Sequence, residues 1–156
     1  MAQDHYYDVT VDWSDGRKGT MTSEELETAI DVATPPQFAK GVEGVWSPEH
    51  LFVAAVNSCL MTTFLAIAEN SKFVFDGFTS KAVGKLELVD GKYTMSEVRL
   101  MPTVLIRNEE EREKATRLLI KSEAACLISN SITSKVILEP TVKVSGQTQD
   151  LIDVIR

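Results

Sequence analysis

The segment from Ser47 to about Ala68 limits what this chain can fold into, because it predicts one long helix that is apolar on nearly every side. Ser47 is a suitable N-cap, and Pro48 suits the first helical turn. Glu49 matches the positive N-terminal end of the helix dipole. An unbroken apolar run, Leu51 to Val56, follows. A helix of this kind in a soluble protein is expected to be buried on all sides.

Polar residues and overall charge argue against a membrane or nucleic-acid partner. Asn57, Ser58, Thr62 and Thr63 interrupt the apolar run well short of the roughly 18 residues that a membrane span needs. The net charge of −7 disfavours binding to nucleic acid or to anionic lipid. We therefore expect neither partner.

The beginning of the chain and its cysteine content bear on the cellular compartment in which the protein is expected. No basic segment followed by an apolar stretch begins the chain, so we expect no secretion signal. A chain of 156 residues can bury its own core, and it has only two cysteines. We therefore expect a reducing environment, the cytoplasm.

Strands are predicted before the central helix. His5–Trp13 is rich in β-forming residues, and the Asp15-Gly16 pair predicts a hairpin that returns through 17–21. Alternation in 25–33 predicts a third strand. The Pro- and Gly-containing stretch 34–46 predicts a loop, which is long enough to suggest a function.

The rest of the chain predicts more strands and a second helix. Two β-rich stretches, 73–89 and 93–106, are joined by a second hairpin turn at 90–92. Asn108 is the expected cap of a helix that runs to about Cys126. A final strand is expected over 135–144, and 147–156 is an unassigned tail. This order predicts one domain, residues 1–156, of the α+β class, with mainly antiparallel strands around the central helix.

The two cysteines, Cys59 and Cys126, fall on apolar faces of the two predicted helices. A free buried cysteine is usually a small hydrophobic residue and nothing more. If the two helices pack together, however, the sulfur atoms could lie within disulfide range, which requires Cα atoms roughly 4.4–6.8 Å apart. Cytosolic cysteines that meet in a core are more often redox-active than structural.

A reactive Cys59 must be a thiolate, yet burial in an apolar site raises a thiol pKa. Cys59 also lies too far from the helix N-terminus for the dipole to help. A cation at ~4 Å contributes about 4 kcal/mol at an effective dielectric near 20. Arginine suits this role because it stays charged when buried, and a carboxylate such as Glu49 would then hold it. Glu49 is equally well explained as a simple helix N-terminal acid.

Three sequence motifs together resemble the OsmC/Ohr family (organic hydroperoxide resistance and osmotically inducible protein C). They are PExLxxAAxxSC at 48–59, DGRxG at 15–19 and EAACLISN at 123–130. The first is the most specific. The DGRxG turn alone would be weak, because Arg17 could equally be an exposed arginine that keeps a hairpin edge soluble.

The resemblance implies a thiol-dependent peroxidase that reduces organic hydroperoxides and folds as an intertwined α+β homodimer. It implies that Cys59 is the peroxidatic cysteine and Cys126 the resolving one. Arg17 would activate the Cys59 thiolate, and Glu49 would orient Arg17. Neither a metal nor a bound cofactor is implied, only an external reductant, a dithiol or a lipoyl-type compound. Family members commonly have proline directly after the second cysteine, where this chain has Leu127.

Three other functions were considered. A non-catalytic or weakly active stress or binding protein with the same fold is the main alternative. A Cys-His-acid hydrolase would use His50, but His50 lies about two and a half turns before Cys59, and His5 is in a predicted strand. A zinc site is disfavoured because no two ligands have the close spacing of such sites. The apolar surroundings of Cys59 favour an alkyl or fatty-acid hydroperoxide over hydrogen peroxide.

Helix geometry predicts that the site contains residues of two subunits. Glu49 and Cys59 are ten residues apart, which corresponds to about 15 Å along one helix. One arginine cannot hold both, and 51–58 contains no proline or glycine to break the helix. If two copies of the helix pack antiparallel about a two-fold axis, Glu49 of one copy lies near Cys59 of the other. We therefore expect a homodimer with two composite sites.

Overall fold

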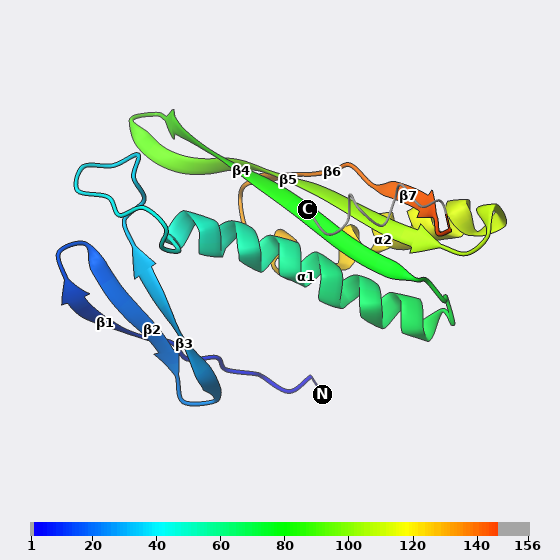
Figure 1. Cartoon of the computed structure of the whole chain (residues 1–156), viewed down its shortest axis with the longest axis horizontal. Coiled ribbons are helices and arrows are strands. Elements are labelled where there is room, and N and C mark those ends of the chain that lie inside the picture. Colours follow the sequence, from blue (N-terminus) through cyan, green and yellow to red (C-terminus); the bar gives the residue numbers. More distant parts are fainter. Residues whose placement is uncertain (1, 147–156) are drawn as a thin grey trace. The chain divides into compact units, whose positions relative to one another are not determined.

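The structure, a computed structural model, describes residues 2–146. The chain divides into two compact units, residues 1–51 and 52–156. The expected α+β class is confirmed, whereas the single domain stays a prediction. In chain order the elements are β1 (Thr10–Asp15), β2 (Lys18–Ser23), β3 (Leu26–Ala33), α1 (Pro48–Asn70), β4 (Gly77–Val89), β5 (Lys92–Ile106), the 3-10 helix η1 (Glu109–Glu111), α2 (Arg112–Ala125), the 3-10 helix η2 (Ser129–Ser131), β6 (Lys135–Leu138) and β7 (Thr141–Val144) (Figure 1).

The first unit contains an antiparallel three-stranded sheet in the order β1-β2-β3. Asp15 pairs with Lys18, so Gly16 and Arg17 form the tight loop that the sequence predicts. Gly16 has φ +50, a conformation that glycine adopts without strain. Paired residues of neighbouring strands share a face, and the register gathers apolar residues on one side. This apolar face of the first sheet consists of Val11, Trp13, Gly19, Met21, Ile30 and Val32.

The loop 34–46 returns to this sheet before α1 begins. Its last residue, Trp46, forms a parallel bridge with Val32 and accepts a hydrogen bond from the Ala33 amide at 2.8 Å. Within the loop the backbone closes tightly: a Cβ on Gly41 would lie 2.1 Å from the Pro35 carbonyl oxygen, so only glycine fits there. The predicted long loop is therefore held against β3 by backbone contacts just before α1 begins.

The second unit is a sheet with β5 at its centre. β5 pairs antiparallel with β4 on one side and parallel with β6 and β7 on the other. The single strand expected over 135–144 is thus two strands, separated at Glu139 and Pro140. On β5, Pro102 lies between the part that pairs with β6 and the part that pairs with β7. Proline has no N–H for a sheet, which explains why the partner strand changes at this point.

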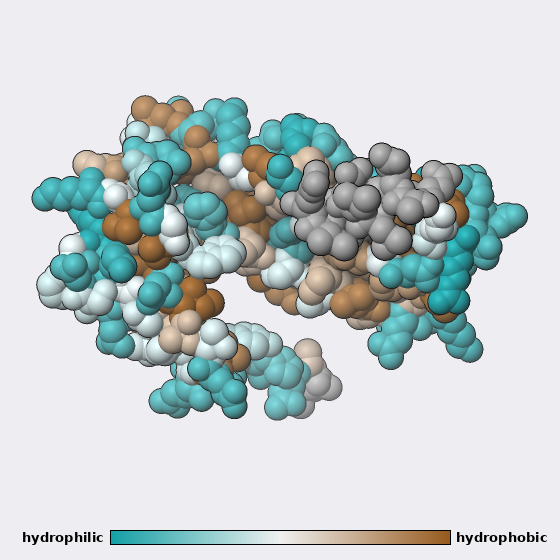
Figure 2. Space-filling view, in the orientation of Figure 1, coloured by the Kyte–Doolittle hydropathy of each residue, from teal (hydrophilic) through white to brown (hydrophobic). Residues whose placement is uncertain are grey.

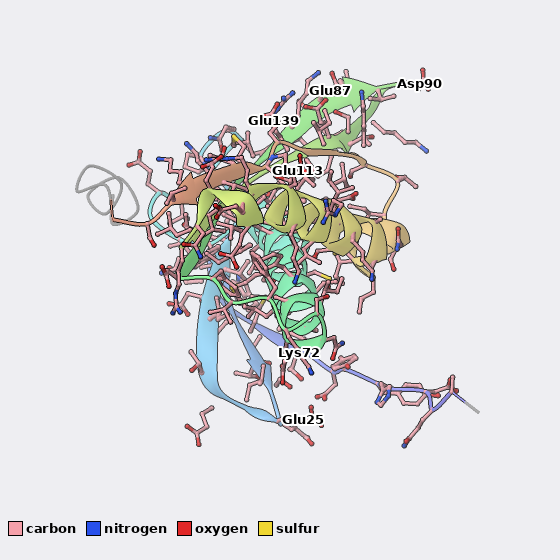
Figure 3. The ribbon with its side chains drawn as sticks, turned by 90° about the vertical axis from the view of Figure 1, so that its right-hand side faces the viewer. Glu25, Lys72, Glu87, Asp90, Glu113 and Glu139 are labelled. Atoms are coloured by element: carbon pink, nitrogen blue, oxygen red, sulfur yellow. The ribbon has the colours of Figure 1, made fainter. Side chains whose placement is uncertain are left out.

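Both helices pack on one face of this second sheet. Residues of α1, α2, β5 and β7, with one from the loop after α1, form one core cluster, which consists of Phe64, Ala68, Phe73, Val104, Ile106, Ala115, Leu118, Leu119 and Val142. A second cluster joins Val56 and Leu60 of α1 to Val98 and Leu100 of β5. Figure 3 shows the same arrangement from another side, with Lys72 just after α1 and Asp90 at the β4–β5 turn. These contacts make α1 the core helix of the second unit.

Only one side of α1 is buried within the chain, so the expectation of burial on all sides is wrong for a single subunit. The buried residues Val56, Cys59, Leu60, Phe64 and Ala68 recur at helical spacing. The opposite side is exposed, and it includes Ser58, Met61, Thr62, Leu65 and Ala66. Among residues 2–146, α1 is the only helix whose length and composition would allow it to cross a membrane.

The start of the second helix differs from the prediction. The Asn108 side chain makes no capping hydrogen bond; its carbonyl accepts one from the Glu111 amide at 3.1 Å. A 3-10 turn of three glutamates, η1, therefore comes first, and α2 begins at Arg112. The predicted tail 147–156 lies outside the described residues.

Candidate functional site

The two cysteines belong to the second unit and are both buried. Cys59 is 8% exposed, on the buried side of α1, and Cys126 is fully buried directly after α2. The Cys126 amide donates to the Glu123 carbonyl at 3.1 Å, which holds the end of α2 in place. Both residues are free thiols, and each displaces the pKa of the other, so their side chains lie close together. The fold therefore brings together the two residues that the sequence analysis selected.

The two thiols have pKa values displaced in opposite directions. Burial raises the pKa of Cys59, but hydrogen bonds from the Cys126 thiol, the Ile128 amide, the Thr63 hydroxyl and the Leu127 amide together bring it below its ordinary value. Burial raises the pKa of Cys126, and its hydrogen bond to Cys59 raises it further. The pair is asymmetric, and Cys59 is the member that ionises first.

The groups that lower the Cys59 pKa differ from the cation that the sequence predicts. Thr63 could have been found: it is four residues after Cys59, on the same side of the helix, and its Oγ1 lies 3.9 Å from the Cys59 sulfur. The amides of Leu127 and Ile128 carry no side-chain signal, so only the folded turn reveals them. These donors are neutral, and they favour the anion through their dipoles.

Arg17, the predicted activating residue, lies in the first unit on the β1–β2 loop. Its side chain is exposed, and none of the ion pairs found among residues 2–146 includes it. Beside it is an open groove of about 390 Å³. The groove is largely apolar, and its lining includes Val11, Trp13, Arg17, Val32, Ala33 and Pro48. The exposed Arg17 side chain therefore lines a largely apolar groove.

Glu49, the predicted partner of Arg17, is half-buried at the start of α1. Its Oε2 atom is buried and has no hydrogen-bond partner among the described residues. A buried carboxylate oxygen without a partner is costly, and a guanidinium would satisfy it. No hydrogen bond or ion pair joins Arg17 to Glu49 within residues 2–146. The predicted pair is therefore not formed within a single subunit.

The structure gives His50 a local role. Its amide donates to the Ser47 hydroxyl at 3.2 Å, and its Nδ1 lies 2.7 Å from the same oxygen. Ser47 is fully buried and caps α1, as its sequence position predicts. Because α1 is continuous, His50 and Cys59 are separated by about 13–14 Å along its axis. This separation does not suit a Cys-His hydrolase.

No group of three or more potential metal ligands occurs among residues 2–146. The site is therefore described by its thiols, its hydrogen-bond donors and the two charged residues of the first unit.

Comparison with known proteins places this fold and these motifs in a family. The model of the OsmC-like protein family matches residues 41–141, which include both cysteines and Glu49. No curated protein matches the chain. Among solved structures, an OsmC-like protein of unknown function from Vibrio cholerae is 25% identical, with a TM-score of 0.79 over 88% of this chain and 99% of that chain.

Two further solved structures show the same fold. An organic hydroperoxide resistance protein, OsmC, from Legionella pneumophila is 22% identical, with a TM-score of 0.72 over 92% of this chain and 100% of that chain. The organic hydroperoxide resistance protein OhrB of Bacillus subtilis is 23% identical, with a TM-score of 0.66 over 89% of this chain and 98% of that chain. The family model covers most of the chain, and the chain therefore belongs to the OsmC-like protein family.

Proposed function

We propose that this chain is a thiol-dependent peroxidase that reduces organic hydroperoxides through Cys59 and Cys126. One observation carries the proposal: two free, buried thiols, one within α1 and one directly after α2, lie close together, and their pKa values are displaced in opposite directions. Such a pair supplies one thiolate as the nucleophile and one thiol held in reserve. The two structural relatives named for hydroperoxide resistance agree with this function.

In the first step the Cys59 thiolate attacks one oxygen of the hydroperoxide. A sulfur–oxygen bond forms, the oxygen–oxygen bond breaks, and the departing alkoxide takes a proton to become an alcohol. Cys59 is then a sulfenic acid. In the second step the Cys126 sulfur attacks the Cys59 sulfur, the sulfenic oxygen leaves as water, and a disulfide forms. An external dithiol, for example of the lipoyl type, restores both thiols by exchange.

The surroundings of Cys59 favour an organic substrate. The neighbouring residues Val56 and Leu60 are fully buried, and Ile128 packs on the same cluster. Apolar surroundings select apolar ligands, so an alkyl or fatty-acid hydroperoxide suits this site better than hydrogen peroxide. The reaction needs no metal and no bound cofactor. It does need a supply of reduced dithiol, which the cytoplasm provides.

The proposal includes a homodimer in which Arg17 and Glu49 complete the site around Cys59. The exposed side of α1, with Met61 39% and Leu65 41% exposed, is apolar enough to pack on a second copy of itself. The apolar face of the first sheet also lacks cover, since Val11 is 59% and Trp13 77% exposed. A second subunit would bury both surfaces. It would also bring a cation to the unpartnered Glu49 oxygen.

The first experiment is peroxide consumption by the purified protein with cumene hydroperoxide and a dithiol. Wild type should turn over. Cys59→Ser should consume none, whereas Cys126→Ser should complete one turnover and leave Cys59 as sulfenic or higher acids, visible by mass spectrometry. A fully active Cys59→Ser variant would disprove the mechanism. A wild type without turnover would favour the non-catalytic alternative.

The second experiment tests the composite site. Inactive Cys59→Ser and Glu49→Ala proteins are mixed and allowed to exchange subunits. In a heterodimer one site carries both lesions and the other carries neither, so activity should return. Sedimentation of wild type supplies the control, because a fully active monomer would exclude the composite site.

A further inference from the structure

We propose that Asn57 of α1 and Ser80 of β4 are a pair of positioning residues, which hold α1 at the setting on the second sheet that lets the two cysteines meet. The two residues bind each other in both directions. Asn57 Nδ2 donates to the Ser80 carbonyl at 2.8 Å, and the Ser80 hydroxyl donates to Asn57 Oδ1 at 2.6 Å. The inference deepens the proposed function and rests on its second step, disulfide formation between the two cysteines.

Asn57 is a polar residue between apolar ones on the side of α1 that faces β4. Val53 and Phe64, four residues before it and seven after it, lie on the same side of the helix. Val53 lies against Gly84 of β4, where an added Cβ would be 2.4 Å from its Cγ2. Phe64 contacts Phe78 of β4, with ring centroids 5.2 Å apart. Asn57 is therefore placed between two apolar contacts of α1 with the same strand.

The hydrogen bonds of Asn57 restrict the helix in a way that these apolar contacts do not. Hydrophobic burial is not directional, so apolar contacts alone would tolerate other settings of α1. Hydrogen bonds require particular distances and angles, so the pair fixes both the rotation of α1 and its position along β4. A shift by one helical position would turn each side chain by about 100° and move it by about 1.5 Å along the axis. A single buried asparagine sets the register of some coiled coils in the same way.

The second sheet leaves the Ser80 carbonyl available to Asn57. Ser80 is opposite Pro102 of β5 in the antiparallel register. Opposed residues of such a pair exchange either two hydrogen bonds or none, and proline has no N–H to donate. β4 is also the last strand of the sheet on this side, so no second strand among the described residues borders it. The donor to this carbonyl is the Asn57 side chain instead.

The setting of α1 matters for the second step because Cys59 follows Asn57 by two residues on the same continuous helix. A disulfide requires Cα atoms roughly 4.4–6.8 Å apart and a narrow range of dihedral angles. Cys126 is fully buried directly after α2, and its side chain lies close to that of Cys59. Rotation of α1 by one position would carry Cys59 away from Cys126. The Asn57–Ser80 pair thus acts on disulfide formation through the helix, without touching either sulfur.

The test compares four variants of the full-length protein with wild type. Asn57→Leu keeps the size of the side chain and removes both hydrogen bonds, whereas Ser80→Ala removes one of them. The double variant should behave as Asn57→Leu alone, because without Asn57 the Ser80 hydroxyl has no partner to lose. Thr79→Ala is the matched control. It removes a hydroxyl from the neighbouring, exposed residue of β4, whose side chain lies on the opposite face of the strand.

The measurement is the equilibrium between the dithiol and the Cys59–Cys126 disulfide in mixtures of reduced and oxidised glutathione. One protein disulfide forms for each oxidised glutathione consumed, and two molecules of reduced glutathione are released. Acid quenching, alkylation and peptide mass spectrometry determine the fraction of disulfide. Asn57→Leu should lower the equilibrium constant about tenfold and Ser80→Ala about threefold, as expected for the loss of two hydrogen bonds and of one. Thr79→Ala should match wild type.

A wild-type constant for Asn57→Leu, an additive effect in the double variant, or an equal change in Thr79→Ala would overturn the inference. Circular dichroism and the urea midpoint show whether each variant is folded, and Ser80→Ala decides the question if Asn57→Leu is not. Lower stability alone would reduce the urea midpoint and leave the constant of the folded protein unchanged, which would also overturn it.

The inference and the proposed function can fail separately, because glutathione replaces peroxide as the oxidant. The expected constants in a protein that consumes no cumene hydroperoxide would disprove the proposed function and leave the role of the Asn57–Ser80 pair standing. Peroxide consumption by wild type together with equal constants for all variants would disprove that role and leave the proposed function standing.

Discussion

The first and second units of this chain differ in net charge and in how well their apolar side chains are buried. Residues 1–51 carry ten acidic and three basic side chains, whereas residues 52–156 carry thirteen of each. All of the net charge of −7 therefore belongs to the first unit. In that unit large apolar side chains remain exposed, among them Tyr7, Val11, Trp13 and Leu26. Figure 2 shows hydrophobic residues, in brown, at several places on the molecular surface.

The second unit, by contrast, has two buried core clusters and contains both thiols. Phe64, Leu100 and Ile106 are fully buried there. The side chains of Cys59 and Cys126 lie close together in the same unit. Within residues 2–146, Arg17 of the first unit forms no ion pair, and the buried Oε2 atom of Glu49 has no hydrogen-bond partner. This contrast supports the proposal that the two thiols are brought together within one subunit, whereas Arg17 and Glu49 need a second subunit to complete the site. Four predictions test this division.

The largest effect is expected on the free energy of unfolding, where a buried ring of the second unit is compared with an exposed ring of the first unit. Phe64 is fully buried and contacts the rings of Phe75 and Phe78, each with centroids 5.2 Å away. Phe64→Ala should reduce the free energy of unfolding by about 3–5 kcal/mol. Trp13→Ala, which truncates an exposed ring, should reduce it by less than about 1 kcal/mol in the free subunit and should weaken association. Urea unfolding and sedimentation measure the two effects, and equal losses of stability would remove the contrast.

The contact of α1 with the second sheet is tested at Gly84. A Cβ at this position would lie 2.4 Å from Val53 Cγ2 and 2.6 Å from Met95 Cε. Gly84→Ala should therefore destabilise the protein by roughly 1–3 kcal/mol, because these side chains must move. The neighbouring Val83, 49% exposed, provides the control, and Val83→Ala should cost little in the same urea titration. A neutral Gly84→Ala would mean that α1 is packed less closely than the structure shows.

Substitutions of Arg17 test whether a residue of the first unit affects the ionisation of Cys59 in the second. Arg17→Ala should slow alkylation of Cys59 about tenfold at pH values below the thiol pKa, because a positive partner of the thiolate is lost. Arg17→Lys should recover part of the rate, since lysine lacks the planar fork that can bridge a thiolate and a carboxylate. Lys18→Ala, next in the chain, is the control. An unchanged titration would return Arg17 to the role of an exposed residue at a hairpin edge.

The smallest effect is expected from an exposed ion pair in the second unit. The pKa of Asp76 is lowered by a hydrogen bond from Ser145 and by Arg107, whose Nε lies 2.9 Å from Asp76 Oδ1. Its charged form therefore stabilises the fold above the ordinary aspartate pKa, and this contribution is lost as the pH falls through the lowered value. The small difference in urea midpoint between wild type and Asp76→Asn should shrink as the pH falls below the ordinary aspartate pKa, because the protonated carboxyl no longer pairs with Arg107. A difference that persists there would have another cause.

Much of the local structure follows from the sequence alone. Alternation and the two glycine-containing hairpin turns predict the strands, and Ser47 with Pro48 and Glu49 predicts the start of α1. The prediction of the final strand was less accurate, because pairing partners are not encoded locally: β6 and β7 are separate, parallel to β5, and meet it on either side of Pro102. Asn108 precedes the 3-10 helix η1 as expected of a cap, but its side chain makes no capping hydrogen bond, and α2 begins only at Arg112.

The site shows the same contrast between what the sequence reveals and what only the folded chain brings into contact. The motifs identified Cys59, Cys126, Arg17 and Glu49 as candidates, because reactive and charged side chains are visible in a sequence. The sequence could not show that the two cysteines lie close together, since they are 67 positions apart and meet only when α1 and α2 pack on one sheet face.

The direction of the Cys59 pKa was decided by tertiary structure alone. Burial by itself would have raised it, and the groups that reverse the effect are two backbone amides, a hydroxyl and a second thiol. Amides occur at nearly every position of the chain, so their presence carries no information, whereas their orientation depends on the turn after α2 and on Ile128 packing against α1. The sequence by itself therefore determined which atoms can react, and the fold decided which of the two thiols is the stronger acid.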